Sequence, residues 1–290
     1  MRKSVQLIAL ITVCFGSIFS SCASAPGQVM TNTSGRDTLT EAAQPTTNRE
    51  IETKRYGLPA NARILERRTI DSTVQANRAL ILWMVDAREN PREGTLEENP
   101  YTCPEETRGH YLSGRARITL LDTATRQIIN TVNVEQQYEG DETPLDTFDL
   151  PYLIHGGSYY HVPGANEDTE GQPEIMRLRD YNGDGAAFEF ALFDALACSA
   201  LQTTLIGYSE IQDKIIQYPI QSTIEENSRH TTEFRRWAGR LFSEEPISPG
   251  FWQYEVDYRG FDGTLDSYEI RYNRETETFE GRLVRRAEEK

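Results

Sequence analysis

Basic residues are scarce in this sequence of 290 residues. Lysine and arginine together number 30, against 45 aspartate and glutamate residues, so that the formal net charge is -15 at pH 7. A surface that binds phosphate groups needs lysine or arginine at each contact. The deficit therefore argues against nucleic-acid binding and against adhesion to an anionic membrane surface. It is compatible with a protein that meets divalent cations.

Familiar catalytic motifs are also missing. The sequence contains no HExxH zinc motif, no P-loop, no GxGxxG and no GxSxG nucleophile elbow. The segment HGGS, which begins at His155, is similar to the oxyanion loop of some α/β-hydrolases, but those enzymes need the missing elbow. We therefore predict a protein that is not an enzyme. The alternative is a secreted hydrolase of glycan or ester, with its site in the 139–178 loop near His155.

The longest apolar stretch lies at the beginning of the sequence. Arg2 and Lys3 precede an apolar stretch over 5–19, which small residues and Cys22 follow. The stretch is too short and wrongly flanked to be a membrane-spanning helix. A basic start, an apolar middle and small residues in this order are typical of a secretory signal peptide.

The end of this segment, FSSC over 19–22, resembles the lipobox of bacterial lipoproteins, with Phe19 in place of the usual leucine. The resemblance implies that residues 1–21 are removed and that Cys22 carries lipid. It also implies a protein anchored in a bacterial cell envelope, with the lipid as its only membrane contact. Ordinary signal cleavage near residues 23–25 is the alternative.

Only four cysteines are present, and Cys103 and Cys198 are the two that lie beyond the signal and its anchor. An even pair in an oxidising compartment is compatible with a disulfide. Two buried free thiols are equally compatible with the sequence. Neither residue lies in a recognisable nucleophile motif.

Residues 22–56 are rich in Thr, Asn, Ser, Gln and Ala and have few large apolar side chains, so we expect a flexible tether. From 57 to 290 we expect a single β-rich globular domain, either a β-sandwich or partial propeller-like sheets, with one or two helices. Short β-rich runs, a hairpin over 115–134 and a second over 266–284 favour this fold class. The spacing of Phe234, Trp237 and Leu241 predicts a helix over 229–242.

The segment RDYNGDGAAFEF, residues 179–190, has the most distinctive chemistry. Two acids and an amide alternate in it, a glycine follows, and the chain then becomes apolar. Calcium prefers six to eight oxygen ligands, and a tight turn directs alternate side chains inward. We therefore predict a calcium site whose ligands are the side chains of Asp180, Asn182 and Asp184 and the main-chain carbonyl of Ala186.

The closing ligand distinguishes between families of calcium loop. EF-hands and dockerin repeats place an acid at position 12, where this sequence has Ala191. The loop resembles instead the FG-GAP loops of integrin-like β-propellers, which place an acid near position 9 and continue into a strand. Glu189 stands at position 10, and the resemblance implies that it completes the set formed by Asp180, Asn182 and Asp184. An Asx-rich turn without metal is the alternative, because Asn-Gly and Asp-Gly favour turns by themselves.

The segment DYRGFDGTLD over 257–266 is a second acidic stretch, for which a solvated turn is the expectation. Taken together, the sequence predicts an exported, membrane-tethered lipoprotein with a calcium-stabilised β-rich domain. Its expected role is binding or structure, and the sequence leaves open whether a ligand is a protein or a glycan.

Overall fold

The structure is a computed structural model of the whole chain. It describes residues 53–72, 74–91, 110–135, 147–151, 153–154, 157–161, 173–197, 200–258 and 263–287. The predicted signal peptide over 1–21 and all but the last few residues of the predicted tether lie outside these ranges. So do Cys22, Cys103, Cys198 and His155.

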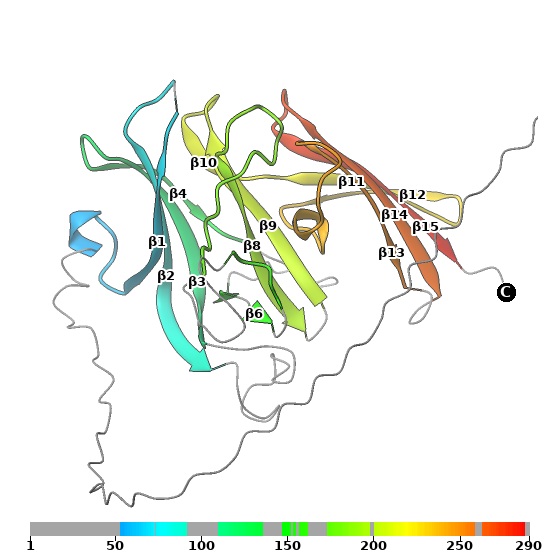
Figure 1. Ribbon diagram of the computed structural model, residues 1–290, viewed down its shortest axis with the longest axis horizontal. Helices are drawn as coiled ribbons and strands as arrows, with labels where there is room; N and C mark the ends of the chain where they lie inside the picture. Colours follow the sequence, from blue (N-terminus) through cyan, green and yellow to red (C-terminus); the bar gives the residue numbers. More distant parts are fainter. Residues whose placement is uncertain are drawn as a thin grey trace, which may run out of the picture. The chain divides into compact units, whose positions relative to one another are not determined.

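The described residues are mainly β, as predicted, and form three larger sheets (Figure 1). The N-terminal sheet has the order β1 (Ala62–Ile70), β2 (Arg78–Pro91), β3 (His110–Asp122) and β4 (Gln127–Asn133), with β5 (Thr147–Leu150) also paired to β3. The middle sheet has the order β10 (Lys214–Gln217), β9 (Ala200–Ser209) and β8 (Glu189–Ala197). The C-terminal sheet has the order β12 (Arg229–Arg235), β11 (Ile220–Glu226), β15 (Thr278–Ala287), β14 (Thr264–Asn273) and β13 (Phe251–Asp257). Strands β6 (Leu153–Ile154) and β7 (Gly157–Ser158) form a separate pair.

Strand β2 is apolar on both of its faces, which explains its unbroken hydrophobic sequence. Leu80, Leu82 and Met84 belong to the main hydrophobic cluster. Ile81 and Trp83 point to the other face and belong to a smaller cluster that also contains Leu58. Successive side chains of a strand point to opposite faces, so only a strand covered on both sides needs apolar residues at every position.

Side-chain amides link the N-terminal sheet to the middle sheet. The Asn130 side chain on β4 donates to the Ile215 carbonyl at 2.8 Å and accepts from the Ile215 N–H at 3.0 Å. Nearby, Gln217 on β10 donates to the Glu135 carbonyl at 2.6 Å and accepts from the Glu135 N–H at 3.1 Å. These two amides satisfy backbone groups at the facing edges of β4 and β10, where a strand would otherwise leave them unpaired.

The C-terminal sheet contains the hairpin that the sequence predicts. Tyr268 lies opposite Leu283, and Tyr272 lies opposite Phe279, in the antiparallel pair of β14 and β15. On its other side β15 pairs in parallel with β11, which enters directly from the middle sheet. Trp252, Ile270 and Phe279 lie on the inner face of the C-terminal sheet and belong to the main hydrophobic cluster. The same cluster contains residues of the other two sheets.

The prediction of a helix over 229–242 is wrong. Residues 229–235 form β12, which pairs antiparallel with β11 across the turn at Asn227 and Ser228. The Phe234 side chain is 63% exposed, whereas Leu241 is buried in the short 3-10 helix η1 (Leu241–Ser243). The three-and-four spacing therefore did not mark one buried face, and pairing with β11 determined the conformation instead.

Helical structure among the described residues is limited to η1 and a single turn at 53–55. None of the helices in this part of the chain is long and apolar enough to cross a membrane.

Candidate functional site

The acidic loop lies between two residues that bridge as in an antiparallel sheet. The Arg179 N–H donates to the Glu189 carbonyl at 2.8 Å, and the Glu189 N–H donates to the Arg179 carbonyl at 3.1 Å. The loop over 180–188 is therefore a closed excursion at the start of β8. Gly183 and Gly185 have φ values of 78° and 93°, a region that other residues rarely adopt.

Side chains of the loop accept hydrogen bonds from its own backbone. Asp180 accepts through Oδ1 from the Gly183 N–H at 2.7 Å and through Oδ2 from the Gly185 N–H at 3.1 Å. The Asp184 N–H donates to Asn182 Oδ1 at 2.9 Å. The Ala186 N–H donates to Asp184 Oδ1 at 2.8 Å. The predicted ligand residues thus form a series of Asx turns, which is the arrangement expected for the alternative without metal.

Glu189 lies beneath this loop and is fully buried. Its Oε2 accepts from the Tyr181 N–H at 3.0 Å, and its Oε1 accepts from Asn182 Nδ2 at 3.1 Å. The same Asn182 Nδ2 also donates to Asp184 Oδ2 at 3.0 Å. A third group that contacts Glu189, the hydroxyl of Tyr218, lies 3.4 Å from its Oε1.

The electrostatics of Glu189 follow from this position. Burial, reinforced by the negative charge of Asp184, raises the pKa of the Glu189 carboxyl from its ordinary value of 4.5 to about 9, although the backbone hydrogen bonds oppose the shift. Burial also raises the pKa of Tyr218 well above its ordinary value. Without a cation, Glu189 is therefore protonated at neutral pH, because its neutral form avoids an uncompensated buried charge.

The chemistry of the donor atoms fits calcium, since they are carboxylate and amide oxygens. Asn182 donates to both Asp184 and Glu189, whereas Asp180 accepts only from the Gly183 and Gly185 N–H groups of the same loop. Both carboxylate oxygens of Asp180 and Oδ1 of Asp184 each accept from one backbone N–H, so each keeps a second lone pair. Within the described ranges, however, no three His, Cys, Asp or Glu side chains converge closely enough to hold a metal ion together.

The acidic loop is also the point where the C-terminal sheet is fastened. A side-chain carbon on Gly183 would lie 2.6 Å from the Pro249 carbonyl oxygen, and one on Gly250 would lie 2.6 Å from the Asn182 carbonyl oxygen. The Gly250 N–H donates to the Tyr181 carbonyl at 3.0 Å, and the Gly250 carbonyl accepts from Tyr272 of β14 at 2.8 Å. The two segments meet backbone to backbone, so any displacement of the loop is transmitted to β13 and β14.

Aromatic rings enclose this junction. Tyr181 stacks on Trp252 of β13 with ring centres 6.4 Å apart. Tyr218, whose hydroxyl reaches Glu189, meets Phe279 of β15 edge to face at 5.8 Å. The loop is therefore part of the hydrophobic core on one side and open to solvent at Asp184 on the other.

The three histidines that lie within the described residues do not come together as a metal site. His110 begins β3, His161 pairs with Glu174, and His230 lies on β12, and all three are exposed. The alternative of a hydrolase centred on His155 stays a prediction, because that residue lies outside the described part of the chain.

The second acidic stretch, residues 257–266, was expected to be a solvated turn, but its last residue is buried. Asp266 is fully buried in β14 and forms a two-pronged ion pair with Arg285 of β15, at 3.0 and 2.9 Å. Asp257 ends β13, and Asp262 lies outside the described residues.

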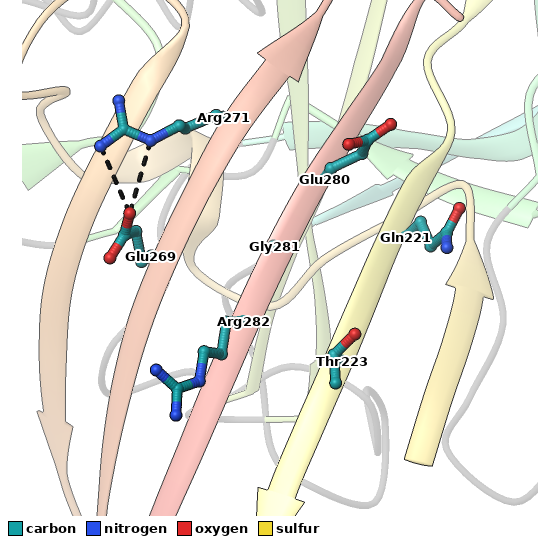
Figure 2. Close-up of a pocket in the computed structure, with 7 residues that line it drawn as sticks. All are labelled: Gln221, Thr223, Glu269, Arg271, Glu280, Gly281 and Arg282. Carbon is teal, nitrogen blue, oxygen red and sulfur yellow. Dashed lines mark hydrogen bonds and ion pairs between the residues drawn. The ribbon is translucent and has the colours of Figure 1, made fainter. Parts of the chain in front are cut away.

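A different feature, which sequence reasoning missed, is a polar groove on the outer face of the C-terminal sheet (Figure 2). Its volume is about 450 Å³, and Gly281 of β15 lies at its centre. The side chains around Gly281 come from β11, β15 and β14: Gln221, Thr223, Glu269, Arg271, Glu280 and Arg282. A second hollow of about 300 Å³ lies beside it towards β13.

Each charged side chain of the groove has a partner, either within the groove or beside it. Arg271 pairs with Glu269, as the dashed lines in Figure 2 show. Arg282 pairs with Glu225, and Glu280 accepts from Asn273 at 2.7 Å. The alternation of polar residues along 267–273 and 280–286 indicates a solvated face. The pairing of β11 with β15, which completes the groove, joins segments that are distant in the sequence.

Comparisons with known proteins identified no relative of this chain. No family model, no curated protein and no solved structure matches this chain.

Proposed function

We propose that this protein is an exported lipoprotein, anchored to a bacterial membrane by lipid on Cys22, with a non-enzymatic binding role. Its domain is stabilised by a calcium ion that binds the loop over 180–189. The ion is a structural clamp, and binding of a partner occurs elsewhere on the domain.

The observation that carries the calcium proposal is the burial of Glu189 beneath Asp184 and Asp180. Asp184 is exposed and Asp180 is half-buried, and their negative charges repel an ionised Glu189 unless a cation compensates them. Asn182 joins two of the three, because its Nδ2 donates to both Asp184 and Glu189. A divalent cation that entered from the exposed side of the loop would meet these oxygens and displace the proton of Glu189.

A clamp is the role that the surroundings favour. The loop contacts the turn around Gly250 through its backbone, and that turn is bonded to Tyr272. An ion that stiffens the loop would therefore hold the C-terminal sheet against the middle sheet. A calcium sensor would instead need a part that moves freely when the ion binds, and this junction is packed with aromatic rings.

Thermal melting of the purified protein tests the clamp. Sites of this class in exported proteins have dissociation constants of about 10⁻⁴ to 10⁻³ M, so 10 mM calcium should raise the Tm by roughly 3–10 °C relative to a chelator. Magnesium should raise it less, because it demands a tighter octahedral geometry than a wide loop offers.

The variant Asp184→Asn is the informative substitution, because an amide oxygen can still accept from the Ala186 N–H. We expect it to fold and to lose the calcium-dependent rise in Tm. Asp71→Ala, which removes an exposed acid before β2, is the matched control and should keep the full rise. A wild-type Tm that does not change with calcium would exclude the clamp, as would an Asp184→Asn variant that still responds.

The anchor is tested separately in the producing cell. We expect wild-type protein to partition with membranes and into a detergent phase, and Cys22→Ser to be recovered as unlipidated protein. Mass spectrometry of the amino-terminal peptide reads the modification directly. An unmodified Cys22, or a mature chain that begins near residues 23–25, would contradict lipid anchoring.

A further inference from the structure

The polar groove is one segment of a longer trough across the C-terminal sheet. Residues directly opposite one another in a sheet point to the same face. Strand pairing therefore places one row of side chains across all five strands: Phe234, Gln221, Glu280, Arg271 and Phe251. A second row runs parallel to the first: Thr232, Thr223, Arg282, Glu269 and Gln253.

The trough lies between these two rows. Figure 2 shows its central part, with Arg271, Glu280 and Gln221 on one side of Gly281 and with Glu269, Arg282 and Thr223 on the other. Neighbouring strands are about 4.8 Å apart, so five strands give a trough about 19 Å long, which is an extended site rather than a pocket for one small molecule.

The walls of the trough offer hydrogen-bond donors and acceptors without a net charge. Arg271 and Arg282 balance Glu269 and Glu280, and each of these side chains has a partner within the sheet. Within the described ranges, the side chains of Gln221 and Thr223 make no hydrogen bond to the protein. An anionic ligand gains no attraction from such a surface, and the net charge of -15 repels it. A neutral ligand rich in hydroxyl groups can use the donors and acceptors together.

An exposed aromatic ring lies at one end of the first row. Phe234 on the edge strand β12 is 63% exposed, so much of its ring is accessible to a ligand. At the other end, Phe251 lies under the guanidinium of Arg271, whose carbon is 3.6 Å from the ring centre. An aromatic face beside planar polar side chains suits a sugar ring, because the C–H face of the sugar can stack on it while its hydroxyls are hydrogen-bonded.

We infer that this trough is the ligand-binding surface of the protein and that its ligand is a neutral oligosaccharide chain lying across the strands. The inference rests on the binding role proposed above and names the class of ligand. Gln221 and Glu280 contact hydroxyl groups in the centre of the trough, and Phe234 stacks on a terminal sugar.

The test is an NMR titration of the full mature protein in calcium, with neutral hexasaccharides of glucose and of N-acetylglucosamine as probes and a hexasaccharide of uronic acid as the charged comparison. We expect at least one neutral probe to shift the amide signals of β11, β14 and β15 along the two rows. The uronic acid probe should bind more weakly than its neutral counterpart.

Two exposed substitutions locate the site without disturbing the fold. Phe234→Ala and Gln221→Ala should each weaken binding by about tenfold, the order of one stacking or one hydrogen-bonding contact. Thr231→Ala is the matched control, because Thr231 is exposed on the opposite face of the same edge strand. It should leave the affinity unchanged.

Several outcomes would overturn the inference. These are the absence of binding by every neutral probe at millimolar concentration, shifts that map away from the two rows, a uronic acid probe that binds best, or equal losses in Thr231→Ala and Phe234→Ala. Calcium stabilisation without any glycan binding would remove only this inference. If the protein bound glycan but its Tm did not change with calcium, only the proposed calcium clamp would be excluded.

Discussion

Glu189 and Asp266 are both fully buried, and these two carboxylates, which lie in different regions of the molecule, are compensated in different ways. Asp266 lies in the β14–β15 hairpin and accepts two hydrogen bonds from Arg285. Glu189 lies at the entrance to β8 and receives neutral donors from Tyr181, Asn182 and Tyr218. The hairpin therefore carries its own counter-charge, whereas the acidic loop does not.

The difference explains why we interpret the ion pair of Asp266 as purely structural and the acidic loop around Glu189 as a binding site. A buried ion pair is complete within the fold, and removing one partner leaves an uncompensated charge. A buried carboxyl without a cation remains neutral by holding a proton, which a metal ion can replace. Glu189 thus couples the junction between sheets to pH and, under the proposed function, to calcium.

The largest effect is expected from removing the counter-charge of Asp266. Arg285→Ala should lower the free energy of unfolding by about 3 kcal/mol, the low end for a broken buried pair because Arg285 is 35% exposed. Arg271→Ala is the control on the neighbouring strand, since its pair with Glu269 is exposed on both sides and contributes far less. Urea denaturation measures both. Equal losses in the two variants would mean that Asp266 needs no counter-charge.

A smaller effect is expected from pH in the presence of a chelator. The pKa of Glu189 is raised in the folded state to about 9, so the folded protein holds one proton more than the unfolded chain between pH 4.5 and about 9. The free energy of unfolding should therefore fall by about 1.4 kcal/mol per pH unit as pH rises through this window, and the stabilisation is complete below pH 4.5. Urea midpoints from pH 6 to 8 give the slope.

The smallest effect is expected from Glu189→Gln at pH 6. An amide resembles the protonated carboxyl in shape and charge, so the stability without calcium should change by less than about 1 kcal/mol. The same variant should reduce the fall in stability with pH and should lose the response to calcium. A large loss of stability at pH 6, or an unchanged pH slope, would contradict a protonated Glu189.

Most strands could be predicted because their sequence periodicity agreed with their burial. The unbroken apolar run of β2 matched a strand covered on both faces, and Tyr268, Ile270 and Tyr272 matched one face of a hairpin. The prediction failed where periodicity was accidental. Phe234 and Leu241 fit one helical face in the sequence, but Phe234 is exposed on an edge strand and Leu241 is buried in η1.

The candidate site was predicted in part. The alternation of Asp180, Asn182 and Asp184 indicated a closed loop, and the loop is there with its glycines in left-handed conformations. The depth of Glu189 and the backbone contact between Gly183 and Pro249 were not predictable, because segments far apart in the sequence create them. The paired charges of the groove were not predictable either, because its strands are also far apart in the sequence.

The sequence by itself determined the fold class, the run of strands and the position of an acidic turn, because these depend on local periodicity and on residues that favour turns. Only the tertiary structure decided that Glu189 is buried without a cation while Asp266 meets Arg285, and that Phe234 is exposed at the end of a polar trough. Burial and cross-strand register depend on which distant strands become neighbours. The same carboxylate is a solvated charge, half of an ion pair or a proton-holding acid according to those neighbours.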